Sequence, residues 1–193
     1  GNDTITTGAS LTTGSVNAGA GTDKLIVGTN VGHIDTATEA SKFTNFETLS
    51  LNGALDVSLL SGITAIELSG AANNISKLSA PQAGSVTATA DIGATTIALA
   101  NSSGTSDALT LIMGNGKGAA FDAGALTING FETLNVTANP LATSADKETV
   151  IASFNADKLT AINLTGNSVD LRNAATTKAV TIDGSESTSA SRP

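Results

Sequence analysis

The tetrapeptide FETL occurs at residues 46–49 and returns at residues 131–134. Each copy follows an aspartate that opens a short apolar run, Asp23 before the first and Asp107 before the second. Self-similar segments that recur along a chain are the sequence signature of repeat architectures. The chain is therefore expected to build its fold by stacking related units.

A second pair of segments extends the repeat. Ile63-Thr64-Ala65-Ile66 matches Leu159-Thr160-Ala161-Ile162, with a larger separation than the FETL pair shows. An insertion in the second copy accounts for the difference, and Ala138–Thr149 is its predicted place. The pattern predicts two units with one strand order, about residues 23–106 and 107–193.

Short β-branched apolar runs, punctuated by Gly, Asn, Asp and Ser, predict strands joined by turns. Helical periodicity is weak, and Ala37–Phe43 and Ser144–Phe154 are the best helix candidates, each with a loop or strand as its alternative. The predicted strands contain LIV (25–27), TLSL (48–51), ITAIEL (63–68), VTATA (86–90), TIALA (96–100), LTLIM (109–113), LTI (126–128), TLNV (133–136), AINL (161–164), VDL (169–171) and AVTI (179–182).

Aromatic residues make up only 3% of the chain, and there is no Trp and no Tyr. A compact globule or a β-sandwich of this length normally packs large rings at its centre. Small aliphatic side chains instead suit thin coils that stack on one another. The predicted fold is all-β, a right-handed parallel β-helix (β-solenoid) formed by residues 1–193 as one elongated segment, with a β-sandwich as the alternative.

Composition excludes several classes of function. The net charge is −8, from 17 carboxylates against 9 Lys and Arg, so nucleic acid is a poor partner and cations are good ones. Cysteine is absent, which excludes disulfides and zinc–thiolate sites. No apolar run is long enough to predict a membrane span, and no signal peptide is visible. The chain is expected to be a fragment of a longer protein.

The segment AGAGTDKLI (18–26) fits the calcium-binding repeat G-G-x-G-x-D-x-U-x, in which U is a large aliphatic residue. GNDTI (1–5) fits the second half of the same repeat. Glycines allow turns that present carbonyl oxygens, and Asp adds a charged oxygen. Ca²⁺ prefers six to eight such oxygens at about 2.3–2.6 Å. The repeat departs from the pattern at Ala18, and the spacing from Asp3 to Asp23 is two residues too long, so a metal-free Gly-Thr-Asp turn remains the alternative.

The chain resembles the C-terminal, lattice-forming region of RTX-type bacterial surface-layer proteins. The resemblance covers nearly the whole chain and rests on five segments taken in order. These are GNDTIT, GSVNAGAGTDKLIV, FTNFETLSLNG, IALANSSGTSDALTL and INGFETLNVTA.

The resemblance implies a cell-surface protein that is exported by type I secretion and that polymerises with copies of itself into a calcium-dependent sheet. It implies lipopolysaccharide anchoring only through a region absent from this chain, with no membrane insertion. The matching motif positions imply RTX-like calcium turns. The implied calcium ligands are Asn2, Asp3, Gly19, Gly21 and Asp23.

Other acidic and basic positions have weaker interpretations. Asp107 is either a further calcium ligand or an aspartate that caps a turn. Glu47 and Glu132 are expected to point outward on different coils, with a solvated or metal-bridging role and no catalytic one. His33 is expected to be an exposed loop histidine.

The expected function is structural, as a component of a calcium-dependent, self-assembling surface layer, and no enzymatic activity is expected. The alternative is an adhesin module of a large secreted RTX protein that binds a glycan or a host surface. Such modules usually bind through exposed aromatic side chains, which are scarce here.

Overall fold

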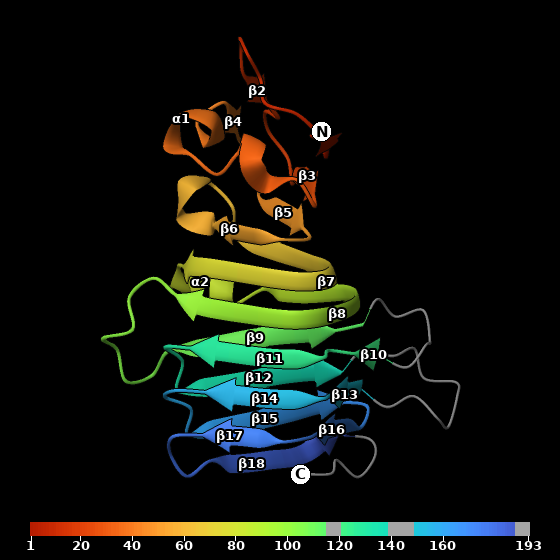
Figure 1. The fold of residues 1–193 in the computed structure, drawn as a ribbon, viewed down its shortest axis with the longest axis vertical. Coiled ribbons are helices and arrows are strands. Elements are labelled where there is room, and N and C mark those ends of the chain that lie inside the picture. The colour runs from red at the N-terminus through yellow and green to blue at the C-terminus, as the bar shows by residue number, and fades with distance from the viewer. Residues whose placement is uncertain (115–120, 139–148, 188–193) are drawn as a thin grey trace.

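The fold is an elongated stack of β-coils, seen in a computed structural model that describes residues 1–114, 121–138 and 149–187 (Figure 1). Most of the predicted insertion, 138–149, lies outside the described residues. The first strand lies near one end of the long axis and the last strand at the other. The predicted all-β solenoid of parallel strands is confirmed.

One face of the stack is a ladder of nine parallel strands. It contains, in spatial order, β1 (Thr4–Thr6), β3 (Lys24–Gly28), β5 (Thr48–Leu51), β7 (Ala65–Leu78), β8 (Val86–Leu99), β9 (Ala108–Met113), β12 (Thr133–Ala138), β15 (Ala161–Gly166) and β18 (Thr181–Ser187).

The other strands complete the coils. The long strands β7 and β8 bend around a corner and also pair on a second face with β6 and β11, respectively. In the last coils each turn of the chain supplies three short strands, one to each face. The second face holds β6 (Ala54–Asp56), β11 (Ala125–Asn129), β14 (Ser153–Ala156) and β17 (Ala174–Thr176). A three-stranded sheet holds β10 (Phe121–Asp122), β13 (Thr149–Ile151) and β16 (Val169–Leu171). A two-stranded sheet holds β2 (Val16–Asn17) and β4 (Phe43–Thr44).

The core is made of aliphatic columns that run along the stack. Leu25 pairs with Leu49, Leu49 with Ile66, and Ile66 with Val86. All four side chains are at most 1% exposed. Because parallel strands lie about 4.8 Å apart, each side chain packs against the equivalent residue of the coils above and below.

The register of the ladder slips where β8 meets β9. Val86 pairs with Leu111 and not with Leu109, which is the first inward residue of its strand. Beyond the slip the strands pair in register, so Leu109 pairs with Leu134 and Leu134 pairs with Ile162. This two-residue slip lies between the two predicted repeat units.

All five phenylalanines are buried, at 7% exposure or less. Phe46, Phe131 and Phe154 are the largest fully buried side chains. Small aliphatic side chains, which the composition favours for the interior, are therefore joined there by all the rings of this chain.

Helices are short and lie at coil corners. The α-helices α1 (Ala37–Ala40) and α2 (Ala80–Ala83) each have four residues, and the 3₁₀ turns are η1 (Val31–His33) and η2 (Val57–Leu59). The helix candidate at Ala37–Phe43 is thus one turn long. The candidate at 144–154 is a pair of strands from residue 149 onward, and α2 was not predicted. Among the described residues no helix has the length and apolarity needed to cross a membrane.

Outward-facing side chains form ion pairs between coils. The Lys24 ammonium lies 2.7 Å from the Glu67 carboxylate, and Lys77 lies 2.5 Å from Asp56. Burial alone would raise the pKa of Asp56, but the hydrogen bonds from Lys77 and Ser58 outweigh it and lower the pKa below its ordinary value of 3.8.

We expect Asp56→Asn to destabilise the protein near neutral pH by about 1 kcal/mol or less, because Lys77 is largely exposed and the pair is screened by solvent. A carboxylate whose folded pKa is lowered stabilises the fold above its unfolded pKa and loses that effect as pH falls through the folded pKa. The difference between variant and parent should therefore shrink as pH falls below 3.8 and vanish below the folded pKa of Asp56. Thermal melting of variant and parent near neutral pH and again below the folded pKa of Asp56 checks this. A difference in melting temperature that persists in acid would contradict it.

Two glycines in left-handed backbone provide a matched test of coil packing. Gly28 (φ +65°) has open space where a Cβ would stand, whereas a Cβ on Gly166 (φ +83°) would overlap the carbonyl oxygen of Ala138. Gly28→Ala should cost about 1–2 kcal/mol from backbone strain alone. Gly166→Ala should cost more, because the neighbouring coil must also move. Urea unfolding of both variants measures the difference, and equal losses would show that the coils are not packed as described.

Candidate metal centre

The glycine-rich turn that precedes β3 meets the start of the chain at one corner of the stack. This first corner contains Asn2, Asp3, Gly19–Asp23 and Glu47. The Asp3 carbonyl oxygen accepts from the Lys24 amide at 2.8 Å, and the Asp23 carbonyl oxygen accepts from the Glu47 amide at 3.0 Å. The corner residues of three successive coils are thus aligned by backbone hydrogen bonds.

Carboxylates add a second set of bonds between these coils. The Asp3 amide donates to Asp23 Oδ1 at 2.6 Å, and the Asp23 amide donates to Glu47 Oε2 at 2.7 Å. Beside them, the Thr22 amide donates to Asn2 Oδ1 at 3.0 Å. Asp23 and Glu47 therefore each cap a backbone amide of the preceding coil. Hydrogen bonds to charged acceptors of this kind are stronger than neutral ones.

Asp23 is the most unusual residue of the first corner. It is 0% exposed, and its Oδ2 atom has no hydrogen-bond partner. An ionised carboxylate is rarely buried without a paired charge or a metal, and an unpaired buried acceptor costs about 1–3 kcal/mol. A bound cation or an ordered water is the usual explanation for such an atom.

The turn before Asp23 needs its glycines. Gly19 (φ +92°) and Gly21 (φ +151°) have positive φ angles. A Cβ on Gly21 would collide with the carbonyl of Gly1, so glycine is required for close contact between the two coils. The structure thereby brings together five of the six predicted ligand residues, all except Asp107.

Asp107 lies in a second corner, farther along the stack, with the same backbone pattern. Its carbonyl oxygen accepts from the Glu132 amide at 2.9 Å, and its amide donates to Glu132 Oε2 at 2.9 Å. The Thr160 amide donates to the Glu132 carbonyl at 2.8 Å, as the Thr64 amide does to the Glu47 carbonyl at 2.8 Å. Asp107 and Glu132 are therefore the structural counterparts of Asp23 and Glu47.

The expectation that both glutamates point outward is wrong. Glu132 is only 8% exposed and Glu47 is half-buried, because each carboxylate reaches back to the preceding coil to accept a backbone amide. The sequence signal for this was their position directly before a strand and one coil after an aspartate. Glu47 and Glu132 do lie on different coils, as predicted.

The two corners differ in charge. In the second corner, Lys158 Nζ lies 4.0 Å from Glu132 Oε1 and also donates to the Ser102 carbonyl oxygen. In the repeat alignment Gly62 stands at the position of Lys158, so the first corner lacks this ammonium. Asp107 Oδ2, like Asp23 Oδ2, is buried without a hydrogen-bond partner.

His33 is buried and not exposed as expected. Its side chain is 2% exposed, and Nε2 contacts Thr7 Oγ1 of the preceding coil, while Nδ1 has no partner. No sequence pattern indicates this contact, because it depends on how η1 folds against the first coil.

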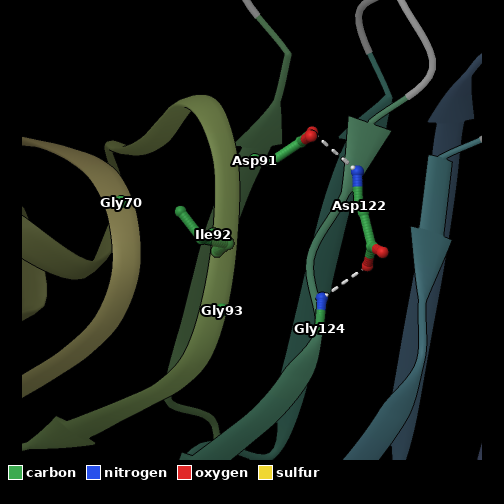
Figure 2. Close-up of a pocket in the computed structure, with 6 residues that line it drawn as sticks. All are labelled: Gly70, Asp91, Ile92, Gly93, Asp122 and Gly124. Carbon is green, nitrogen blue, oxygen red and sulfur yellow. Dashed lines mark hydrogen bonds between the residues drawn. The ribbon is translucent and has the colours of Figure 1, made fainter.

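A shallow groove of about 380 Å³ lies where β7 and β8 bend between the first and second faces, beside β10, and no sequence motif predicts it (Figure 2). Gly70, Gly93 and Gly124 leave room at this bend. Asp91 Oδ1 accepts from the Asp122 amide at 3.0 Å, and Asp122 Oδ1 accepts from the Gly124 amide at 2.8 Å. Both aspartates are exposed and serve as backbone caps in this arrangement.

The residues of the first corner fit a hard cation. Asp23 offers a buried, unpartnered oxygen, and every other candidate ligand there is also an oxygen donor, as calcium prefers. Within the described ranges, no three His, Asp or Glu side chains form a metal-binding group. Backbone carbonyls of the glycine turn would therefore supply the remaining ligands.

Comparison of the chain with protein-family models, curated proteins and solved structures found no match in any of the three. The chemistry of the two corners is therefore the basis for inferring a function.

Two substitutions of Asp23 separate its hydrogen bond from its charge. With a chelator present, Asp23→Ala should destabilise the fold by about 1–3 kcal/mol, because the Asp3 amide loses its acceptor. Asp23→Asn keeps that acceptor and removes a buried charge, so it should be the more stable of the two. Thermal melting with a chelator ranks the variants, and Asp23→Asn melting at or below Asp23→Ala would contradict the described bond.

Proposed function

We propose that this chain is a structural segment of a calcium-dependent, self-assembling layer on a bacterial cell surface, of the RTX surface-layer type. The buried carboxylate of Asp23, with one oxygen unpartnered at a glycine-rich corner, is the observation that carries the proposal. Calcium bound there would stabilise the stacking of the first coils, because a metal that binds only the folded chain adds its binding energy to folding.

The shape of the molecule supports a scaffold role. Repeated coils give an elongated body with a polar, acidic exterior. In the described parts of the chain, Ile182 of the last strand is the single exposed large hydrophobic side chain, at 44% exposure. A net charge of −8 would keep copies apart until cations screen or bridge their carboxylates. Calcium would therefore act on folding and on assembly together.

The adhesin alternative has less support. Glycan-binding surfaces usually place aromatic rings against the sugar, and all five phenylalanines of this chain are buried while Trp and Tyr are absent. No aromatic platform is left on the surface for stacking.

Calcium should raise the melting temperature of the 193-residue chain by about 5–10 °C when its concentration is about 100-fold above the dissociation constant. We expect circular dichroism to show this shift with calcium and not with an equal concentration of magnesium, which accepts irregular oxygen cages poorly. Electron microscopy should then show ordered sheets only with calcium. An unchanged spectrum and melting point after chelation would contradict the calcium role, and calcium binding without sheets would contradict the coat.

A further inference from the structure

The first and second corners share the backbone hydrogen bonds around their Asp–Glu pairs, which allows a comparison of the two pairs. The Asp-to-Glu amide bonds are 2.7 Å in the first and 2.9 Å in the second. The residues before each buried phenylalanine, Asn45 and Gly130, both have positive φ angles, of 58° and 90°. The turns before the two aspartates differ, since Gly19 and Gly21 have positive φ angles and no residue of 101–106 does. Differences in cation binding between the corners can therefore come from these turns and from the charged side chains around each pair.

Charge compensation is the main difference. Each corner has one exposed aspartate in addition to its acidic pair, Asp3 in the first and Asp157 in the second, where Asp157 Oδ1 accepts from the Gly130 amide at 2.8 Å. Only the second corner has a lysine against its glutamate. Lys24 follows Asp23 in the chain, but its ammonium is bound by both Glu67 oxygens at 2.7 and 2.9 Å.

Burial differs in the same direction. Asp23 is fully buried, whereas Asp107 is only partly buried and follows an exposed loop, residues 101–106. Asp23 and Glu47 sit on adjacent coils, about 4.8 Å apart along the stack. Two carboxylates on neighbouring coils, one of them excluded from water, repel each other unless a positive charge lies near them.

We propose that Asp23 and Glu47 together bind one divalent cation at the first corner, and that the Lys158 ammonium takes the place of the cation at the second corner. Glu47 is thus a cation ligand that no calcium motif of the sequence includes, and Asp107 belongs to a corner that needs no metal. The inference rests on the proposed calcium-dependent function and specifies where its cation acts. The all-oxygen donor set selects a hard divalent ion, calcium in preference to zinc.

Glu47→Gln and Glu132→Gln form a matched pair for the test. Both keep an oxygen that can accept the aspartate amide and remove one negative charge. Calorimetric titration of the 193-residue chain with calcium should show that Glu47→Gln weakens the tightest site about tenfold or more. Glu132→Gln should leave both the affinity of that site and the calcium-induced rise in melting temperature unchanged.

Lys158→Met tests the second half of the inference. Removing the ammonium leaves Glu132 and Asp107 uncompensated, so the variant should bind one more calcium ion than the parent. It should melt lower than the parent in chelator and recover when calcium is added. No added calcium equivalent in Lys158→Met would overturn the role of this lysine.

The outcomes separate this inference from the proposed function. If the parent chain binds no calcium, the proposed function fails at its first step. If the parent binds calcium and Glu47→Gln binds it equally well, the corner assignment is wrong while the calcium-dependent function stands. If Glu132→Gln loses calcium as Glu47→Gln does, the asymmetry between the corners is wrong.

Discussion

The structure depends on the in-register stacking of aliphatic side chains from one coil to the next. Leu25 pairs with Leu49 and Leu49 with Ile66, and the register between β3 and β5 shifts only after Ile26. A parallel strand shifted by one residue would turn its inward side chains outward, so the hydrophobic pattern fixes the register strongly. Most polar groups therefore lie at outward-facing positions or at the corners where the chain changes direction. Among the buried exceptions in the strands, the Asn73 side-chain amide donates to Thr95 Oγ1.

At the corners, the stacking of the coils brings charged side chains against backbone amides. A backbone amide at a corner lies outside the strand pairing of a face and still needs a hydrogen-bond acceptor. The carboxylates of Asp23, Glu47 and Glu132 supply that acceptor from the following coil. A carboxylate used in this way is drawn into the stack and loses water. The same residue is then both a structural cap and a buried negative charge, which explains how a cation site can arise inside a repeat that serves packing first.

Much of the fold was readable from residues, and much of the site was not. Alternating aliphatic runs and the repeated FETL segments predicted parallel coils, and the glycines before Asp23 predicted a tight corner. The burial of Glu132 was missed, because alternation within one strand says nothing of a side chain that turns toward the preceding coil. The contact between Lys158 and Glu132 was also missed, since it joins residues 26 positions apart through a register that only the folded chain defines. The two-residue register slip between β8 and β9 was not predicted, for the same reason.

The groove at Asp91 and Asp122 has a shape that no short sequence pattern encodes. Neither residue lies in a recognisable pattern, and both belong to corners whose shape depends on Gly93 and Gly124. Small residues leave space only when the coils around them are in place. Surface shape therefore follows from the order of the stack and not from any short segment.

The placement of β1 and β18 near opposite ends of the long axis has a mechanical consequence (Figure 1). Tension applied through the two ends of the described chain pulls along the interstrand hydrogen bonds and not across them. Bonds loaded in this direction rupture a few at a time, so the coils would peel away singly at low force, each releasing its own length of chain. A protein built in this way yields gradually under load and can absorb stretching without losing its remaining turns.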